Sequence, residues 1–514
     1  MPDRPTTEKD KPERHASHAS AQSRQVDVAG ISNGVRGQSR SIAIAIFLAV
    51  WLSSGWYLQA RDWNVASRLM LVYALGDRGS LSIDGLDKQT GDLAFKDGHY
   101  YSDKAPGYSL LATPAYFVGK KLFGFADHPL GKDGFPHWPA DAWVTWFSSG
   151  LATACIAVIL SNILIRIDVP RSWAVLAAIA AIWASPLAVY ATLAYGHAVS
   201  SACMVLAGAM VMTNQEQGIS KQRAFVIGFS AGLGVLVELA QAPFAIIIGI
   251  VALSRSTNLK NLTDMAVMMI LGAIPAALAL FVYNYVAFGS PLDMGYFYHA
   301  TKQFAEVHSA ENPLGLKNPD FSKLKPLLWG EYRGLLFYAP WAALAVPGWG
   351  LMLRDRLWPA FWISLAGVAV PLWVNLSYPE WTGGWSTGPR LLVTALPWAA
   401  LAAGYGCRSK FVRFAIVPTF VWGWVINSLC LSVGGRISQD IARPLRDAVV
   451  PIWLEGRPPM FWPGEPFARV FLSEWLSEAG LSNFTTDVRL WACILAGTQL
   501  IFVLSIIRIG RARP

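Results

Sequence analysis

The chain has 514 residues, of which 54% are hydrophobic and only 15% are charged, with a formal net charge of +9. About a quarter of the residues in a typical soluble domain are charged, so this composition excludes an ordinary soluble globular protein. Much of the positive charge lies in the N-terminal tail and in short connections between apolar runs. That location indicates membrane topology, and no nucleic-acid partner is expected.

The first 40 residues are rich in Ser, Lys, Arg and Glu and poor in aliphatic residues, which is typical of a disordered segment. The first apolar run begins near Ser41, too far into the chain and too long for a cleavable signal peptide. We therefore predict a disordered cytoplasmic tail over residues 1–40, followed directly by the first membrane span.

Repeated apolar runs of membrane length follow this tail. At about 1.5 Å per residue, a run such as 265–288 is long enough to cross a hydrocarbon core of roughly 30 Å. Residues 224–253 could form one long tilted helix, but Glu238, Gln241 and Pro243 interrupt them, so we predict two undersized helices there. The chain is predicted to be an all-α polytopic membrane protein of about twelve transmembrane helices. The predicted spans are 41–58, 142–165, 173–192, 198–213, 224–239, 243–253, 264–288, 335–353, 357–376, 391–406, 411–433 and 488–508.

Alternate short connections between these spans carry Lys and Arg, as cytoplasmic segments do. The residues are Arg166, Arg171, Lys221, Arg223, Arg255, Lys260, Arg354, Arg356, Arg408, Lys410, Arg413, Arg508, Arg511 and Arg513. This alternation of basic and non-basic connections predicts a multi-pass protein of the cell inner membrane with both termini in the cytoplasm. The extracytoplasmic side then receives long loops over 59–140, 289–334 and 434–487 and a shorter one over 377–390.

The first outside loop is the richest in polar residues. Its partly apolar stretch 108–123 could lie in the membrane interface as a short amphipathic helix. Asp62 directly follows the first span, a position suited to a general base at the lipid boundary. The alternative is an ordinary interfacial aspartate paired with Arg61 or Arg68. Asp92 is the second candidate for the base.

Lys104 lies between Asp103 and a Pro-Gly turn in the same loop. A lysine held at the membrane surface could bind the phosphate of a lipid carrier, or it could simply be attracted to anionic head groups. A second cluster covers 378–390, in which tryptophan faces suit a sugar ring and Arg390 presents a planar fork that matches phosphate. An aromatic turn that caps two spans is the alternative for this cluster.

Other chemistry-bearing patterns are missing from the sequence. There is no phosphate-binding Gly-Lys loop, dinucleotide fingerprint, zinc-binding His-Glu helix or Gly-x-Ser-x-Gly elbow. The five cysteines are scattered, so neither a disulfide framework nor a metal site is predicted.

The order of these motifs resembles the C-type glycosyltransferase superfamily, polytopic enzymes that use polyprenyl-phosphate sugars and include protein O-mannosyltransferases and the lipid A aminoarabinose transferase. The resemblance covers roughly 41–430. It is carried by Asp62 after the first span, by the Tyr-Tyr-Ser-Asp-Lys-Ala-Pro-Gly segment over 100–107, by Phe-Gly-Ser-Pro over 288–291, by Tyr-Arg-Gly over 332–334, and by 381–390. Asp62 is followed by Trp63 where the family has a second acidic residue, and Ala105 follows Lys104 where the family has proline.

The resemblance implies a fold of the same type and a donor that is a polyprenyl-phosphate sugar. Asp62 would be the general base, with Asp92 next in line. Lys104, Arg390 and Arg333 would bind the donor phosphate. Substrate contacts are expected from Arg68, Tyr101, Trp381 and Trp385.

The sequence therefore predicts a catalytic core over 41–433, an outside loop over 434–487, and a last span with a basic end over 488–514. The expected activity is transfer of a sugar, with inversion, to a cell-envelope glycan, lipid or protein on the extracytoplasmic side. A multi-pass transporter or flippase is the alternative, but it would need ionisable residues deep in several spans, and these spans are nearly free of charge. A scaffold without catalysis is a third possibility.

Overall fold

The structure is a computed structural model that describes residues 40–125, 138–212, 218–301, 307–309, 311–456, 460–462, 465–466, 468–470 and 487–511. The predicted tail lies almost entirely outside these residues, as do parts of the three long loops. The chain divides into two units, Met1–Ala45 and Ile46–Pro514, and the second unit contains every candidate site residue.

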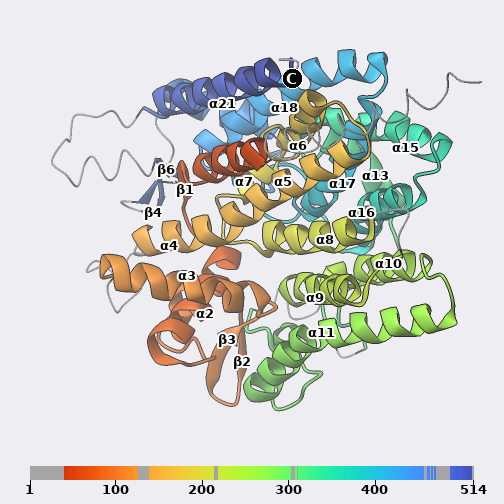
Figure 1. The fold of residues 1–514 in the computed structure, drawn as a ribbon. Helices are drawn as coiled ribbons and strands as arrows, with labels where there is room; N and C mark the ends of the chain where they lie inside the picture. Colours follow the sequence, from red (N-terminus) through yellow and green to blue (C-terminus); the bar gives the residue numbers. More distant parts are fainter. Residues whose placement is uncertain are drawn as a thin grey trace, which may run out of the picture. The chain divides into compact units, whose positions relative to one another are not determined.

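The described part of the chain is mostly helical (Figure 1). After a first helix over Arg40–Ser54, the α-helices are α2 (Trp63–Arg78), α3 (Gly107–Phe123), α4 (Trp138–Thr145), α5 (Leu151–Arg166), α6 (Arg171–Trp183), α7 (Leu187–Tyr190), α8 (Gly196–Met212), α9 (Lys221–Val237), α10 (Ala242–Leu253), α11 (Leu259–Phe288), α13 (Leu324–Leu328), α14 (Leu335–Tyr338), α15 (Ala345–Arg354), α16 (Trp358–Ser377), α17 (Leu396–Gly406), α18 (Lys410–Ser432), α19 (Val450–Glu455) and α21 (Val488–Arg511). Short 3-10 or π segments are η1 (Asp87–Gln89), η2 (Trp146–Gly150), η3 (Leu239–Gln241), η4 (Gly295–Tyr298), η5 (Phe321–Lys323), η6 (Pro340–Leu344), η7 (Arg390–Ala395) and η8 (Leu445–Val449).

Among the described residues, five helices are long and apolar enough to cross a membrane on their own. They are Pro139–Arg166, Leu259–Phe288, Trp358–Ser377, Lys410–Ser432 and Val488–Ile506. Shorter apolar helices cover Arg40–Ser54, Arg171–Trp183, Gly196–Met212 and Leu239–Leu253. Helical structure lies at each of the twelve predicted spans, but the count of twelve membrane crossings stays a prediction.

Several predicted spans are broken, and proline or an extended residue lies at the breaks. The predicted span 173–192 divides into α6 and α7 around Pro186, because the residue before a proline is disfavoured in an α-helix. The predicted span 335–353 divides at Pro340, which has no backbone N–H to donate. Residues 224–253 form two helices, separated at the extended residue Glu238.

In the described residues, three two-stranded antiparallel sheets accompany the helices, so the prediction of a purely α protein was incomplete. They pair β1 (Tyr57–Gln59) with β6 (Ala468–Val470), β2 (Leu93–Lys96) with β3 (His99–Ser102), and β4 (Met460–Trp462) with β5 (Glu465–Pro466). In the β2–β3 hairpin Leu93 lies opposite Ser102. Asp92 and Asp103 therefore leave the same end of this hairpin together.

Helices α9 and α11 lie side by side and approach closely through glycines. A Cβ atom at Gly228 would lie 1.9 Å from the carbonyl oxygen of Met269, and one at Gly272 would lie 2.2 Å from the carbonyl oxygen of Phe225. Small residues allow such close backbone packing between helices in a membrane. The outer face of α11 exposes large apolar side chains such as Ile270 and Leu278, which suits contact with lipid.

This packing predicts that Gly228→Ala destabilises the protein, because the added methyl group must push α9 away from α11. Overpacking of this kind typically costs about 1–3 kcal/mol. Thermal unfolding of the purified protein in detergent measures the effect. Gly497→Ala is the matched control, since nothing lies within 4 Å of a Cβ atom there. Equal unfolding temperatures for the two variants would contradict the close approach.

Candidate active site

Asp62 lies at the N-terminus of α2. In the chain it follows the first helix, which ends at Ser54, and strand β1. It is the N-cap residue, and its Oδ1 accepts a hydrogen bond of 2.8 Å from the backbone N–H of Val65. Its Oδ2 accepts a hydrogen bond from the Tyr195 hydroxyl and lies 3.4 Å from Nη1 of Arg436. Both carboxylate oxygens are therefore held in place.

The two neighbouring arginines pair with other carboxylates. Arg61 forms a buried two-point ion pair with Asp141, with N–O distances of 2.5 and 2.7 Å. Arg68 pairs with Glu238 at 2.9 Å. The alternative in which Asp62 is paired with Arg61 or Arg68 is therefore wrong. The cation that pairs with Asp62 comes instead from the segment after α18.

These surroundings determine the charge of Asp62. Burial raises the pKa of its carboxyl group, but the charge of Arg436 and the hydrogen bonds from Tyr195 and Val65 lower it more. The pKa of Asp62 therefore lies below its ordinary value of 3.8. The carboxylate is ionised at neutral pH, as a general base must be.

Arg390 reaches this carboxylate through Tyr195. Its Nη1 donates a hydrogen bond of 3.2 Å to the Tyr195 hydroxyl, and its guanidinium carbon lies 5.1 Å from the centre of the Tyr195 ring. Burial lowers the pKa of Arg390, but Tyr195 and Tyr190 and, to a smaller extent, the charges of Asp62 and Asp92 raise it more. The structure thus links Arg390 to Asp62 through the Tyr195 hydroxyl.

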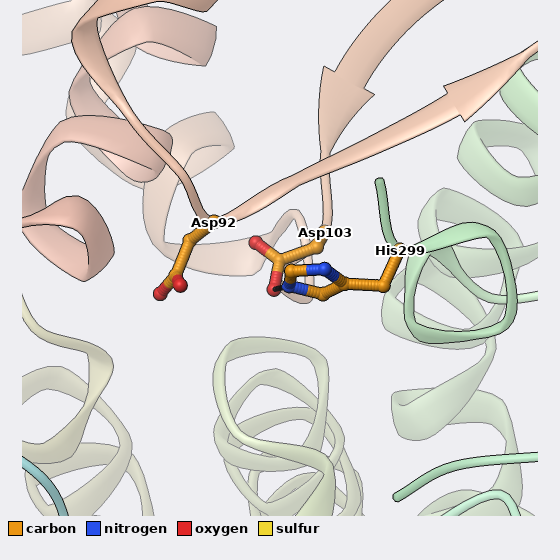
Figure 2. Close-up of side chains that lie close together, drawn as sticks. All are labelled: Asp92, Asp103 and His299. Carbon is orange, nitrogen blue, oxygen red and sulfur yellow. Dashed lines mark ion pairs between the residues drawn. The ribbon is translucent and has the colours of Figure 1, made fainter. Parts of the chain in front are cut away.

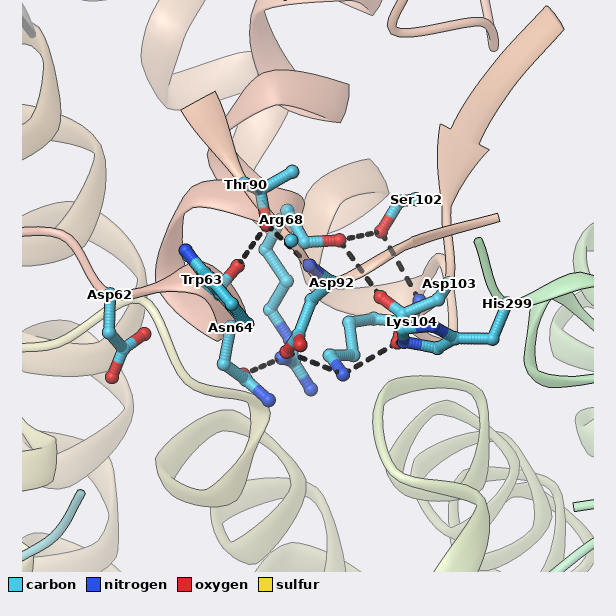
Figure 3. Close-up of polar contacts among 12 residues, drawn as sticks. Asp62, Trp63, Asn64, Arg68, Thr90, Asp92, Ser102, Asp103, Lys104 and His299 are labelled. Atoms are coloured by element: carbon cyan, nitrogen blue, oxygen red, sulfur yellow. Dashed lines mark hydrogen bonds and ion pairs between the residues drawn. The ribbon is translucent and has the colours of Figure 1, made fainter. Parts of the chain in front are cut away.

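Lys104 occupies the end of the β2–β3 hairpin, between two carboxylates. Its Nζ lies 2.8 Å from Oδ2 of Asp92 and 2.7 Å from Oδ2 of Asp103. Figure 3 shows these three side chains in one continuous set of contacts, with Asp62 to one side of them. The hairpin register explains the arrangement, because it places Asp92 and Asp103 next to each other.

Asp103 has further partners besides Lys104. The Ser67 hydroxyl on α2 donates to its Oδ1 at 3.1 Å, and Nε2 of His299 lies 3.4 Å from its Oδ2 (Figure 2). One potential ligand atom from each of Asp92, Asp103 and His299 lies within 4.8 Å of the others. These residues could hold a divalent cation, but Lys104 already supplies positive charge between the two carboxylates, so we assign no metal to them.

Burial and the shared lysine affect the two carboxyl groups differently. Burial raises the pKa of Asp92, and the attraction of Lys104 only partly offsets it, so the net pKa is raised. For Asp103, burial also raises the pKa, but Lys104 and His299 more than offset it, and the net pKa lies well below the ordinary value. Of this pair, Asp92 is therefore the group that takes up a proton first.

Lys104→Met is predicted to destabilise the protein, because it removes the positive charge that lies between two buried carboxylates. Breaking a buried ion pair typically costs about 3–5 kcal/mol. The loss should shrink as the pH falls toward the carboxyl pKa values, because protonation removes the repulsion. Thermal unfolding between neutral and acidic pH measures this. The exposed Lys88→Met is the control, and adding Asp92→Asn to Lys104→Met should recover part of the loss; no recovery would contradict the shared pairing.

Arg333, predicted to bind the donor phosphate, is fully buried. Its guanidinium donates to the backbone carbonyl groups of Thr382, Gly384 and Tyr332, at 2.9 to 3.0 Å. A cation whose donors are used in this way holds the turn over 382–386 in shape. We therefore assign Arg333 a structural contact and do not place it on the phosphate.

The predicted substrate-binding residues are spread over several elements. Arg68 is buried on α2 in its pair with Glu238. Tyr101 lies on β3, edge-on to Phe288 at 5.5 Å between ring centres. Trp381 makes a similar contact with Tyr332 at 6.2 Å, whereas Trp385 is exposed. A role for these four residues in substrate binding therefore stays a prediction.

The sequence did not identify several residues around Asp62 and Lys104. Tyr195 lies in a short connection between α7 and α8, and Arg436 follows α18 in a segment from which nothing specific was expected. Asp103 was part of the quoted motif but received no role, and His299 was not considered. A lone tyrosine, histidine or arginine in a loop gives no periodic or spacing signal, so only the fold could bring these residues together.

Comparison with known proteins gives structural matches but no sequence matches. No protein-family model matches the chain, and no curated protein matches it. The chain is similar in structure to ArnT from Cupriavidus metallidurans bound to undecaprenyl phosphate, with a TM-score of 0.48, 14% identity, and coverage of 93% of this chain and 77% of that chain. It is also similar to the oligosaccharyltransferase AglB from Archaeoglobus fulgidus, in complex with an inhibitory peptide and a dolichol-phosphate, with a TM-score of 0.40, 11% identity, and coverage of 87% and 60%. Both proteins are members of the C-type glycosyltransferase superfamily, the superfamily that the sequence motifs resemble.

Proposed function

We propose that this protein is a membrane glycosyltransferase that moves a sugar from a polyprenyl-phosphate donor to a cell-envelope glycan, lipid or protein. The observation that carries the proposal is the ionised carboxylate of Asp62, fixed at the start of α2 with Arg390 linked to it through Tyr195. A base and a phosphate-binding cation in one place are what transfer from a sugar phosphate requires.

In the proposed reaction, the acceptor hydroxyl oxygen attacks the sugar carbon that carries the phosphate. Asp62 takes the hydroxyl proton, the new bond from oxygen to carbon forms, and the bond from carbon to phosphate oxygen breaks. The polyprenyl phosphate leaves with its negative charge, which Arg390 and Lys104 stabilise. One displacement at the sugar carbon inverts its configuration.

Lys104 needs a way to reach the phosphate, because it is already paired with two carboxylates. The raised pKa of Asp92 means that this carboxyl group can take up a proton and so free the lysine. A donor phosphate beside Lys104 would raise this pKa further by repulsion, so that Asp92 takes up a proton and releases its hold on the lysine. In this proposal Asp92 controls the availability of Lys104 and is not itself the base.

The lipid part of the donor also has a candidate location. An almost wholly apolar groove of about 470 Å³ lies among α9, α10 and α11. Leu236 lines it, and a Cβ atom at Gly107, three residues after Lys104, would lie 2.5 Å from the backbone of Leu236. A polyprenyl chain in this groove would begin near the lysine proposed to hold its phosphate.

For the location in the cell we retain the topology given by the basic connections. The loops with Asp62, Lys104 and Arg390 would lie on the extracytoplasmic face of the inner membrane, and both termini would lie in the cytoplasm. Residues 41–433 would form the catalytic core, as the sequence motifs indicate.

Asp62→Asn should abolish sugar transfer, with a loss of at least about 10²–10⁴-fold. Its fold should survive, because an asparagine oxygen can still accept the N-cap hydrogen bond from Val65. The measurement is transfer by the purified variant with a panel of undecaprenyl-phosphate sugars and a membrane extract as acceptor source. Asp97→Asn, an exposed change in the same loop, is the control. Full activity in Asp62→Asn, with the control also active, would rule out Asp62 as the base.

Gly249→Phe should weaken the use of long-chain donors by filling the groove. Nothing lies within 4 Å of a Cβ atom at Gly249, so the ring can enter open space without forcing the helices apart. KM should rise for an undecaprenyl donor and stay unchanged for a short-chain analogue with the same sugar phosphate. Gly497→Phe, also at an open position, is the control. A parallel change of both KM values would count against this location for the lipid.

A further inference from the structure

We propose that Arg436 is a positioning residue for Asp62: it holds the carboxylate toward the site, ionised and in a single orientation. The inference rests on the proposed role of Asp62 and adds to it a residue from a segment outside the motifs. Nη1 of Arg436 lies 3.4 Å from Oδ2 of Asp62, the oxygen that also accepts from Tyr195. The Arg436 side chain is 1% exposed and that of Asp62 17%.

The segment that carries Arg436 is fixed from both sides. The N–H of Gly435 donates to the carbonyl group of Cys430 on α18 at 2.7 Å. The Thr387 hydroxyl donates to the carbonyl group of Gly435, and the N–H of Ser386 donates to the carbonyl group of Ile437 at 3.1 Å. Arg436 is therefore attached to the loop over 377–390, the same loop that ends with Arg390.

Glycine at position 435 makes this approach possible. Its φ angle is +58°, in the left-handed region that favours glycine, and an added Cβ atom would lie 2.5 Å from a methyl group of Val189. The chain turns tightly here and aims the next side chain back toward α2. Any other residue at 435 would strain the turn that directs Arg436.

Arg436 differs from the other polar groups around Asp62, because it forms an ion pair with the carboxylate. Val65 and Tyr195 supply neutral hydrogen bonds, and Arg390 acts on Asp62 at longer range, through Tyr195. Burial and, to a smaller extent, the negative charge of Asp62 raise the pKa of Asp92. Arg436 is the ion-pair partner of Asp62 within the described part of the chain, and its charge lowers the pKa of Asp62 more than that of Arg390 does.

A double-mutant cycle in thermal stability tests this pairing without any sugar donor. Asp62→Asn, Arg436→Gln and the double variant are compared with the natural protein at neutral and acidic pH, in the same detergent. We expect Arg436→Gln to destabilise at neutral pH and the double variant to lose less than the two single losses combined. The coupling should disappear at acidic pH, where Asp62 is protonated. Additive losses at every pH would overturn the proposal.

The activity arm separates a positioning role from a merely structural one. Arg436→Gln should lower kcat on the order of tenfold to a hundredfold, with KM for the donor little changed, and should move the acidic limb of the pH profile to higher pH. Arg436→Lys, which keeps the charge, should restore much of the rate. The exposed Arg443→Gln in the same segment is the matched control and should leave the profile unchanged.

The two arms fail independently. If the stability coupling is present but Asp62→Asn still transfers sugar, the proposed catalytic role of Asp62 falls and the pairing with Arg436 stands. If Asp62→Asn is inactive but the coupling is absent, or Arg436→Gln keeps the natural pH profile, the proposed function stands and Arg436 has no positioning role.

Discussion

The compensation of buried negative charge is the constraint on which the rest of the site depends. A carboxylate removed from water remains ionised only where cations and hydrogen-bond donors replace the lost solvation. In this protein the carboxylates lie near α2 and the β2–β3 hairpin. Lys104 comes from the hairpin itself, whereas Arg390 and Arg436 come from segments far along the chain. The helices therefore have to assemble correctly before the site can be stable.

The two aspartates next to these cations have opposite properties for a physical reason. Asp62 combines an N-cap hydrogen bond, a tyrosine hydroxyl and an arginine, and its charged form is favoured. In the part of the chain that the structure describes, Asp92 shares the cation at close range, Lys104, with Asp103, and its protonated form is therefore favoured more than that of Asp62. Environments that separate the pKa values of two nearby acids also separate their roles. This difference is why we give Asp62 the proton transfer and Asp92 the control of a neighbouring charge.

Helical segments could be predicted well from the sequence, and the site only in part. Long apolar runs gave the positions of α5, α11, α16, α18 and α21, because length and hydropathy are properties of the local chain. Breaks at Pro186 and Pro340 divided two runs that looked continuous. Short strands carry too little pattern to be recognised, and the β2–β3 hairpin was missed for that reason. Motifs suggested Asp62, Lys104 and Arg390 as candidates. Tyr195 and Arg436 could not be suggested in this way, because their proximity to Asp62 depends on three-dimensional packing between distant segments.

The pairing of β1 with β6 has a consequence for biosynthesis. Strand β1 ends three residues before Asp62, and β6 precedes α21, the last helix described. A ribosome finishes the first strand long before it makes the second, so the nascent chain carries Asp62 for most of its synthesis without Arg390, Arg436 or the strand that closes the sheet. The arrangement around Asp62 can therefore form only after the chain has been made as far as β6. A chain that stops before Arg436 would carry the Asp62 carboxylate without its ion-pair partner, so early termination leaves this negative charge uncompensated.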